Sequence, residues 1–250
     1  MQTLLTIDIG NSSAKGYLFR DGSLIGKIKV QSDCLHEFLS YASRQNATGV
    51  AICSVAESAE DLAAAMRRRL GIPVVVLDRT ALLPLDTSEY DRSRLGADRL
   101  AAAAGALAIN PGNSLVIDAG TALTVDLVAD CKFLGGNISP GVSMRLDSLH
   151  AFTSRLPQVD PCGETPLLGH DTETAIRAGV IGGICAEISN IYTNLERRYA
   201  PLIPIITGGD AQILSRYLQD HGIECVESPA LTGIGLASVF AHNIHMAFQN

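Results

Sequence analysis

Two segments of the chain repeat one another, and this duplication constrains the fold more than any other feature of the sequence. Residues 4–12 read LLTIDIGNS and residues 114–122 read SLVIDAGTA, so an offset of 110 aligns an apolar stretch that ends in Asp-x-Gly in both copies. A second apolar stretch, a turn with an aspartate and a third stretch past a glycine follow each copy. Stretches of this kind joined by short turns predict a three-stranded meander at the start of each half.

The similarity between the halves continues after the predicted meanders. Each half goes on as strand, helix and strand, at residues 49–55, 59–70 and 74–77 in the first half and at residues 202–207, 211–221 and 224–226 in the second. The second half holds an additional long helix over residues 172–198, in which apolar residues recur every three or four positions. A turn of Asn-Pro-Gly-Asn at residues 110–113 predicts the boundary, so we expect one domain over residues 1–112 and another over residues 113–250.

The composition restricts the classes of protein to which the chain can belong. Apolar residues make up 47% of the 250 residues and charged residues 18%, which is too apolar and too weakly charged for a disordered chain. The net charge of −7 argues against sequence-independent binding to nucleic-acid phosphates, so no nucleic-acid partner is expected. No apolar run approaches the length of a membrane-spanning helix, so no membrane partner is expected either.

The cysteines and the first residues of the chain both favour the cytoplasm. None of the six cysteines forms a Cys-x-x-Cys pair or stands at metal-finger spacing from a histidine, so we interpret them as free thiols in a reducing compartment. The first residues lack the basic region, the long apolar stretch and the cleavage site of a secretory signal. We therefore expect a cytoplasmic protein.

The duplicated Asp-x-Gly turns are candidate anion sites. A short turn between two strands exposes backbone N–H groups, and glycine and small hydroxyl residues leave room for an anion to approach them. Two such turns facing each other across a cleft could hold a polyphosphate, with a cation beside Asp8 and Asp118. The alternative is that each aspartate only closes a strand before a turn, which is common for a single copy. Two copies in matching contexts favour the functional interpretation, and the sequence contains no P-loop motif.

Further motifs stand in a defined order around these turns. The set consists of Asp8–Ser12 (DIGNS), Gly96–Arg99 (GADR), Asp118–Ala122 (DAGTA), Gly135–Gly141 (GGNISPG), Thr153–Pro157 (TSRLP), Gly169–Gly179 (GHDTETAIRAG) and Thr207–Asp210 (TGGD). With this set the chain resembles the type III pantothenate kinases, within the superfamily of acetate and sugar kinases, Hsp70 and actin. The resemblance implies an α/β fold of two duplicated RNase H-like (actin-like ATPase) lobes, each a mixed sheet flanked by helices, with a cleft between them. It also implies ATP-dependent phosphorylation of pantothenate to phosphopantothenate, the first step of coenzyme A biosynthesis.

The resemblance assigns the first turn to ATP, which Mg²⁺ would accompany. It implies ATP contacts along Asp8, Ile9, Gly10, Asn11, Ser12, Ser13, Ala14 and Lys15, and at Thr121 in the second turn. Lys15 could reach a phosphate as a point charge, and an exposed lysine at a strand edge is an equal alternative. Asp118 would ligate a monovalent cation, K⁺ or NH₄⁺, which the residues alone do not distinguish from Mg²⁺ because both accept oxygen ligands.

The same resemblance assigns pantothenate to the Gly96–Arg99 motif. Asp98 would be the general base that accepts the proton of the substrate hydroxyl, and Arg99 would bind the pantothenate carboxylate. Gly96 and Ala97 would contact the substrate as well. From the residues alone, Asp98 is better explained as an ordinary acidic residue at the start of a helix predicted over residues 100–109.

Tyr90 and Thr172 are implied as two further substrate contacts. The alternative for Tyr90 is a partly exposed loop tyrosine. The alternative for Thr172 is the N-cap of the long helix, a position that Asp171 could fill instead. The resemblance also implies a homodimer, in which the long helix over residues 172–198 is a plausible interface element.

Two other functions remain open at this point. One is a non-catalytic accessory protein or transcriptional activator of the same family. That function predicts the loss of residues among Asp8, Asp98, Arg99, Asp118 and Thr121, and all five are present. The other is a kinase of the same superfamily that acts on a sugar or another small acid.

Overall fold

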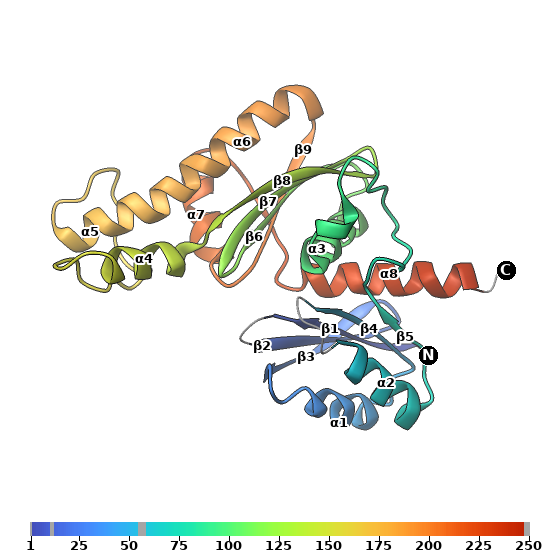
Figure 1. The fold of residues 1–250 in the computed structure, drawn as a ribbon. Helices are drawn as coiled ribbons and strands as arrows, with labels where there is room; N and C mark the ends of the chain where they lie inside the picture. The colour runs from blue at the N-terminus through green and yellow to red at the C-terminus, as the bar shows by residue number, and fades with distance from the viewer. Residues whose placement is uncertain (1, 11–12, 55–58, 248–250) are drawn as a thin grey trace. The chain divides into compact units, whose positions relative to one another are not determined.

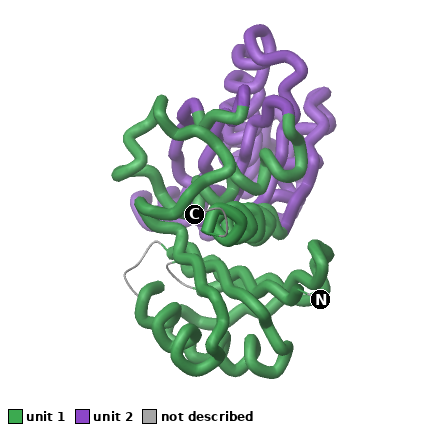
Figure 2. The backbone as a smooth tube through the Cα atoms, turned by 90° about the vertical axis from the view of Figure 1, so that its right-hand side faces the viewer, with its two compact units in different colours: residues 1–111, 131–133, 230–250 green, residues 112–130, 134–229 purple. Residues whose placement is uncertain are grey.

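The computed structural model describes residues 2–10, 13–54 and 59–247, and it divides the chain into two compact units. The first unit comprises residues 1–111, 131–133 and 230–250, and the second comprises residues 112–130 and 134–229 (Figure 2). Asn11 and Ser12, two of the residues expected to contact ATP, lie outside the described residues. In the part of the chain that is described, none of the helices has the length and apolar character needed to span a bilayer.

The first unit is built on a five-stranded mixed sheet in the order β3-β2-β1-β4-β5. Its strands are β1 (Thr3–Ile9), β2 (Ser13–Arg20), β3 (Ser23–Gln31), β4 (Gly49–Ser54) and β5 (Val74–Val76). The first three strands form an antiparallel meander, β4 runs parallel to β1, and β5 runs parallel to β4. Apart from Asp8, every residue of β1 is buried, as expected for a central strand covered on both faces.

Helices cover both faces of this sheet. The helices of this unit are α1 (His36–Arg44), α2 (Ala59–Leu70), the short helix η1 (Arg92–Arg94), α3 (Ala97–Ile109) and α8 (Leu231–Ala247). Figure 1 shows α1 and α2 on one face and α8 on the other. The core under α1 and α2 contains Leu5, Ile7, Phe38, Ile52 and Met66, all fully buried.

The second unit repeats this plan. Its strands are β6 (Asn113–Ala119), β7 (Ala122–Ala129), β8 (Lys132–Pro140), β9 (Leu202–Thr207) and β10 (Val226–Glu227), in the order β10-β9-β6-β7-β8. Its helices are α4 (Val142–Ala151), α5 (Thr172–Arg177), the π-helix η2 (Ala178–Gly182), α6 (Gly183–Tyr199) and α7 (Ala211–Asp220). Counted from the meander, both sheets have the strand order third, second, first, fourth, fifth, which confirms the predicted duplication and the mixed α/β sheets.

The structure refines the alignment of the two halves by one residue. β1 and β6 are 110 residues apart, whereas β2 and β7, like β3 and β8, are 109 apart. The missing residue falls in the turn of the second Asp-x-Gly hairpin. The next turns correspond at the shorter offset, because Asp21 and Asp130 both adopt left-handed backbone, with φ of 47° and 52°. Left-handed residues are what tight hairpin turns require, so the predicted turns with an aspartate are confirmed.

The predicted long helix is present but is not uniformly α-helical. Five residues of π-helix, Ala178–Gly182, separate α5 from α6 within the expected range. The apolar stripe still faces the core, where Ile176, Val180, Ile184 and Ile188 are buried. A wider turn of this kind moves the stripe around the helix by one position, and the change occurs where two glycines, Gly182 and Gly183, follow one another.

Helix α8 is not predicted from the sequence. Its glycines Gly233 and Gly235 lower helix propensity, and its apolar residues surround the helix without a clear stripe. The glycines are explained by packing, because a Cβ atom on Gly235 would collide with the backbone of Ala101 in α3, and one on Gly105 would collide with that of Leu231. Close contact with α3 groups residues 230–250 with the first unit, although they follow the second half in the sequence.

Candidate active site

The first Asp-x-Gly turn lies at the end of β1. Asp8 pairs with Lys15 on β2 and with Cys53 on β4, and the N–H of Gly10 donates to the carbonyl oxygen of Ser13 at 3.1 Å to close the turn. The Lys15 side chain is exposed, and Asp8 is half-buried. The expected ATP contacts Ile9 and Ala14 have their side chains in the core, so only their backbone atoms are available to a ligand.

The Asp8 carboxylate stands in a partly dehydrated place beside a thiol. The Sγ of Cys53 donates to Oδ1 of Asp8 at 3.5 Å. Burial raises the pKa of Asp8, and the negative charge of Asp98 raises it further, while the thiol and Lys15 act in the opposite direction. The pKa of the fully buried Cys53 thiol is raised by burial and by the charges of Asp8 and Asp98, so it remains a protonated donor. The structure therefore brings Asp8 and Asp98 within electrostatic range of one another.

Asp98 is the second residue of α3, and Gly96 is the N-cap. Its Oδ1 accepts a hydrogen bond from the N–H of Arg99 at 2.8 Å, so the carboxylate folds over the start of the helix. A Cβ atom on Gly96 would collide with this oxygen, so a larger residue there would require the Asp98 carboxylate to move. The helix-start interpretation and a role as base are thus compatible, because the carboxylate is half-buried and held on a rigid element.

Arg99 lies against two aromatic rings. Its Cζ is 5.8 Å from the ring centroid of Tyr90 and 5.5 Å from that of Phe133, and its side chain is buried. The two rings meet edge to face at 5.4 Å. Tyr90 and Arg99 are predicted from the sequence, whereas Phe133 is not, since an apolar residue in a strand after a turn carries no functional signal of its own.

The second Asp-x-Gly turn repeats the first at the end of β6. Asp118 pairs with Thr124 on β7 and Thr207 on β9, and the Gly120 N–H donates to the Ala122 carbonyl oxygen at 3.2 Å. Asp118 is half-buried and Thr121 is exposed. The described residues hold no group of three or more histidine, cysteine, aspartate or glutamate side chains that could bind a metal ion. A cation beside Asp118 would therefore take most of its ligands from backbone and hydroxyl oxygens.

The Gly135–Gly141 motif supports the second turn from outside. The N–H of Gly141 donates to the carbonyl oxygen of Thr121 at 3.0 Å, and a Cβ atom on Gly141 would collide with the Gly120 and Thr121 carbonyl groups. Beyond it, Arg145 of α4 pairs with Glu187 of α6 at 2.6 Å. Both residues also hydrogen-bond the Ser139 hydroxyl, at 3.0 Å from Arg145 and 2.8 Å from Glu187. The motif is thereby fixed between the turn and the long helix.

Thr172 begins the long helix, and Asp171 provides its N-cap. The Asp171 carboxylate accepts from the N–H of Thr174 at 2.8 Å, and the Thr174 hydroxyl accepts from the N–H of Asp171 at 3.1 Å. The Thr174 N–H and hydroxyl, which both donate to the carboxylate, lower the pKa of Asp171. The capping alternative for Thr172 is therefore wrong. Thr172 is exposed at the first helical position.

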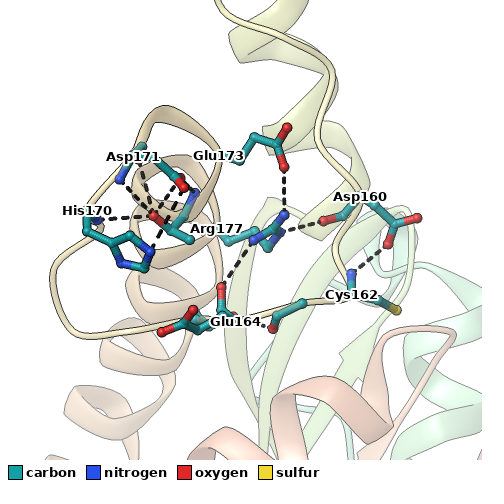
Figure 3. A network of polar contacts seen from close by, with 10 residues as sticks. Asp160, Cys162, Glu164, His170, Asp171, Glu173 and Arg177 are labelled. Atoms are coloured by element: carbon teal, nitrogen blue, oxygen red, sulfur yellow. Dashed lines mark hydrogen bonds and ion pairs between the residues drawn. The ribbon is translucent and has the colours of Figure 1, made fainter.

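Arg177 fastens the segment that leads into this helix. Its guanidinium donates to the carbonyl oxygens of Asp160 and Glu164 at 3.1 and 3.3 Å and pairs with Glu173 at 3.0 Å (Figure 3). The segment over residues 152–171 has little regular structure, so these bonds give it a defined course up to Thr172.

Comparison with known proteins groups this chain with one family. The sequence pattern of type III pantothenate kinase matches residues 4–194. A type III pantothenate kinase of Phocaeicola vulgatus is 40% identical over 208 residues, which cover 82% of this chain and 86% of that protein. One from Porphyromonas gingivalis is 38% identical over 245 residues, which cover 96% of this chain and 98% of the relative.

A solved structure shares the fold over nearly the whole length. It is a protein of Campylobacter jejuni that is described as a member of the Baf family of transcriptional activators. The TM-score is 0.65 at 24% identity, and the match covers 96% of this chain and 99% of the other. At this identity the similarity concerns the fold alone.

Proposed function

The chain belongs to the type III pantothenate kinase family, and from this premise we propose how its residues phosphorylate pantothenate. It has the actin-like ATPase fold, and its activity is the transfer of a phosphoryl group from ATP to pantothenate in coenzyme A biosynthesis. The observation that carries the residue assignment is the Gly96–Arg99 motif at the start of α3. There a half-buried carboxylate and a buried guanidinium stand next to one another in the chain. The activator function is not favoured, since all five residues that it would be expected to lose are present.

We propose that Arg99 binds the pantothenate carboxylate and that Asp98 accepts the hydroxyl proton. A guanidinium presents a planar fork of N–H donors that matches a carboxylate. The deprotonating hydroxyl oxygen forms a bond to the γ-phosphorus of ATP, the bond from that phosphorus to the bridging oxygen breaks, and ADP leaves. Gly96 and Ala97 have no bulky side chain to obstruct the substrate, and Tyr90 and Thr172 supply hydroxyl groups to it.

We propose that the first turn binds the ATP phosphates and that Thr121 of the second turn contacts them as well. The exposed Lys15 side chain is suited to anionic oxygens, and the small residues of the turn leave room for them to approach. The divalent cation that accompanies ATP neutralises phosphate charge when it is bound. The half-buried Asp8 carboxylate fits a place beside such a cation–phosphate group, because its charge is incompletely solvated.

We propose K⁺ or NH₄⁺ as the cation at Asp118. One carboxylate together with hydroxyl and backbone oxygens matches a weakly charged ion better than a divalent one, which gathers several carboxylates. Thr124 and Thr207 flank Asp118 in the sheet, and Gly120 follows it in the turn. These residues would provide neutral oxygen atoms around the ion.

We also propose that the protein is a cytoplasmic homodimer. Phe152, Leu167 and Leu168 are 89%, 85% and 84% exposed, which is unusual for large apolar side chains, and they lie in the segment that leads into the long helix. A second copy would cover them. The six cysteines are all free, as in a reducing compartment. Replacement of Leu167 and Leu168 by glutamate is expected to reduce the mass in light scattering to that of a monomer.

The function is tested with an assay that measures the rate of ADP formation through a coupled colour reaction. We expect turnover with pantothenate but not with a panel of sugars or other small hydroxy acids, and stimulation by KCl over NaCl. The Asp118→Asn variant should lose that stimulation. Absence of turnover on pantothenate at millimolar ATP would contradict the assignment, and turnover on a sugar would favour the sugar-kinase alternative.

A further inference from the structure

We propose that Phe133 is a positioning residue that makes the enzyme selective for a carboxylate by fixing the Arg99 guanidinium against Tyr90. The inference rests on the proposed role of Arg99 in binding the pantothenate carboxylate. Phe133 is the second residue of β8. Its side chain has no polar group, so it would not be sought among the substrate contacts.

The three side chains form one cluster. The guanidinium of Arg99 lies 5.5 Å from the Phe133 ring and 5.8 Å from the Tyr90 ring, within the range of cation–π attraction. The rings are at 88° to one another, so they offer the guanidinium two differently oriented surfaces. An arginine has a long, flexible side chain, and contact with two rings removes most of that freedom.

The backbone holds Phe133 in place independently of Arg99. The Phe133 N–H donates to the carbonyl oxygen of Asp86 at 2.8 Å, and the Asp86 N–H donates to that of Cys131 at 2.9 Å. Lys132 pairs with Asp86 and Glu89 at 3.7 and 3.8 Å. Residues 86–90 and 131–133 therefore form one small structure that carries both rings. The Phe133 side chain is fully buried, and this rigid support is what a positioning residue needs.

Burial gives the cluster its selectivity. Arg99 is only 6% exposed and keeps its positive charge at any accessible pH. In such surroundings an oriented guanidinium favours a ligand with a full negative charge over a neutral ligand of the same shape. Loss of the Phe133 ring would let the guanidinium rotate and admit more water. The preference for a carboxylate would then fall, while ATP binding would not change.

The test compares pantothenate with its primary amide, in which a neutral group replaces the carboxylate. In Phe133→Leu we expect the KM for pantothenate to rise about tenfold, equivalent to about 1.4 kcal/mol, with the KM for ATP unchanged. The KM for the amide should stay within about twofold of the wild-type value, so the ratio of kcat/KM for acid over amide falls about tenfold. Phe133→Tyr keeps the ring and should restore most of the ratio.

A matched control separates positioning from loss of packing. Phe38→Leu removes another fully buried phenylalanine of the first unit, in the core under α1, and should lower Tm without changing the acid-to-amide ratio. An unchanged ratio in Phe133→Leu, or equal losses with acid and amide, would overturn the inference. If instead Arg99→Gln leaves the ratio at the wild-type value, the proposed role of Arg99 itself is wrong.

Discussion

The thiol of Cys53 and the carboxylate of Asp8 occupy directly paired positions on the parallel strands β4 and β1, and the thiol donates to the carboxylate. The second unit has the same relationship in register, where Thr207 of β9 pairs with Asp118 of β6. Each turn aspartate is therefore flanked, on the parallel neighbour, by a small buried residue that carries a donor group. This correspondence suggests that the donor position is part of the duplicated turn.

Replacing Cys53 tests whether its thiol supports ATP binding through Asp8. Cys53→Ala removes the hydrogen-bond donor to the half-buried Asp8 carboxylate, so we expect the KM for ATP to rise about fivefold, as for a weak bond to a charged group. Cys53→Ser restores a donor and should return the KM towards the wild-type value. Cys185→Ala, at a buried thiol of the second unit, serves as the control and should leave the KM for ATP unchanged. Equal effects of Ala and Ser at position 53 would show that volume matters rather than the donor.

Asp8 should reduce the stability of the protein at neutral pH. Burial raises its pKa in the folded state, so the folded protein binds this proton more tightly than the unfolded chain does. The protonated form of Asp8 therefore stabilises the fold relative to the charged form. This contribution is fully present below the ordinary pKa of an aspartate and is lost as the pH rises through the pKa of the folded state. We expect Asp8→Asn to raise Tm at pH 8 by a few degrees, since a protein of this size gains ~2–4 °C per kcal/mol of unfolding free energy. This gain should disappear near pH 4, where Asp8 of the wild type is protonated.

Thermal unfolding followed by circular dichroism across this pH range checks the prediction. Asp130→Asn changes an exposed aspartate in a turn and should show no such gain. A Tm of Asp8→Asn that lies below the wild type at pH 8 would mean that the charged form stabilises the fold. Activity of Asp8→Asn is expected to be lost in any case, because its carboxylate is proposed to act at the phosphates.

Asp98→Asn should abolish proton transfer with little change in structure. The amide keeps the shape of the side chain and can still accept from the Arg99 N–H, so α3 is expected to start as before. We expect kcat to fall by about 10²–10⁴, the range for loss of a general base, while the KM for ATP and the mass of the protein in solution stay the same. Steady-state kinetics and light scattering measure both. A variant with kcat within threefold of the wild type would remove Asp98 from the role of base.

Gly141→Ala should disturb the second turn by direct contact. The added methyl group would press on the Gly120 and Thr121 carbonyl groups, and such overpacking costs about 1–3 kcal/mol. We expect a lower free energy of unfolding and a higher KM for ATP, measured by urea denaturation and kinetics. Gly183→Ala is the matched control, since nothing lies within 4 Å of its added Cβ atom. That helical substitution should be neutral or stabilising.

The sequence predicts much of the fold because its strongest signal is local and repeated. The two Asp-x-Gly stretches locate both meanders, and the ranges expected for α2 and β9 agree with the structure. The fold class, family and activity are confirmed by the comparisons. The roles of the site residues and the domain boundary between residues 112 and 113 stay predictions.

What the sequence does not reveal depends on contacts between distant segments. Phe133 looks like any buried strand residue until the chain folds it onto Arg99, which lies 34 residues earlier in the sequence. Gly233 and Gly235 look like helix breakers until α3 is present to explain them. The residue missing from the second turn cannot be recognised in the sequence either. An offset of 110 aligns the two Asp-x-Gly motifs correctly, and only the strands that follow them require an offset of 109.

The packing of α8 on α3 has a consequence for the order in which the protein can fold during synthesis. A ribosome finishes residues 134–229, which form most of the second unit, before it makes the helix that covers one face of the first sheet. Until α8 has been made, this face of the first sheet lacks the helix that covers it, although the sequence of the second unit is already complete. Domains usually fold in the order in which they emerge, and this topology reverses the order of completion.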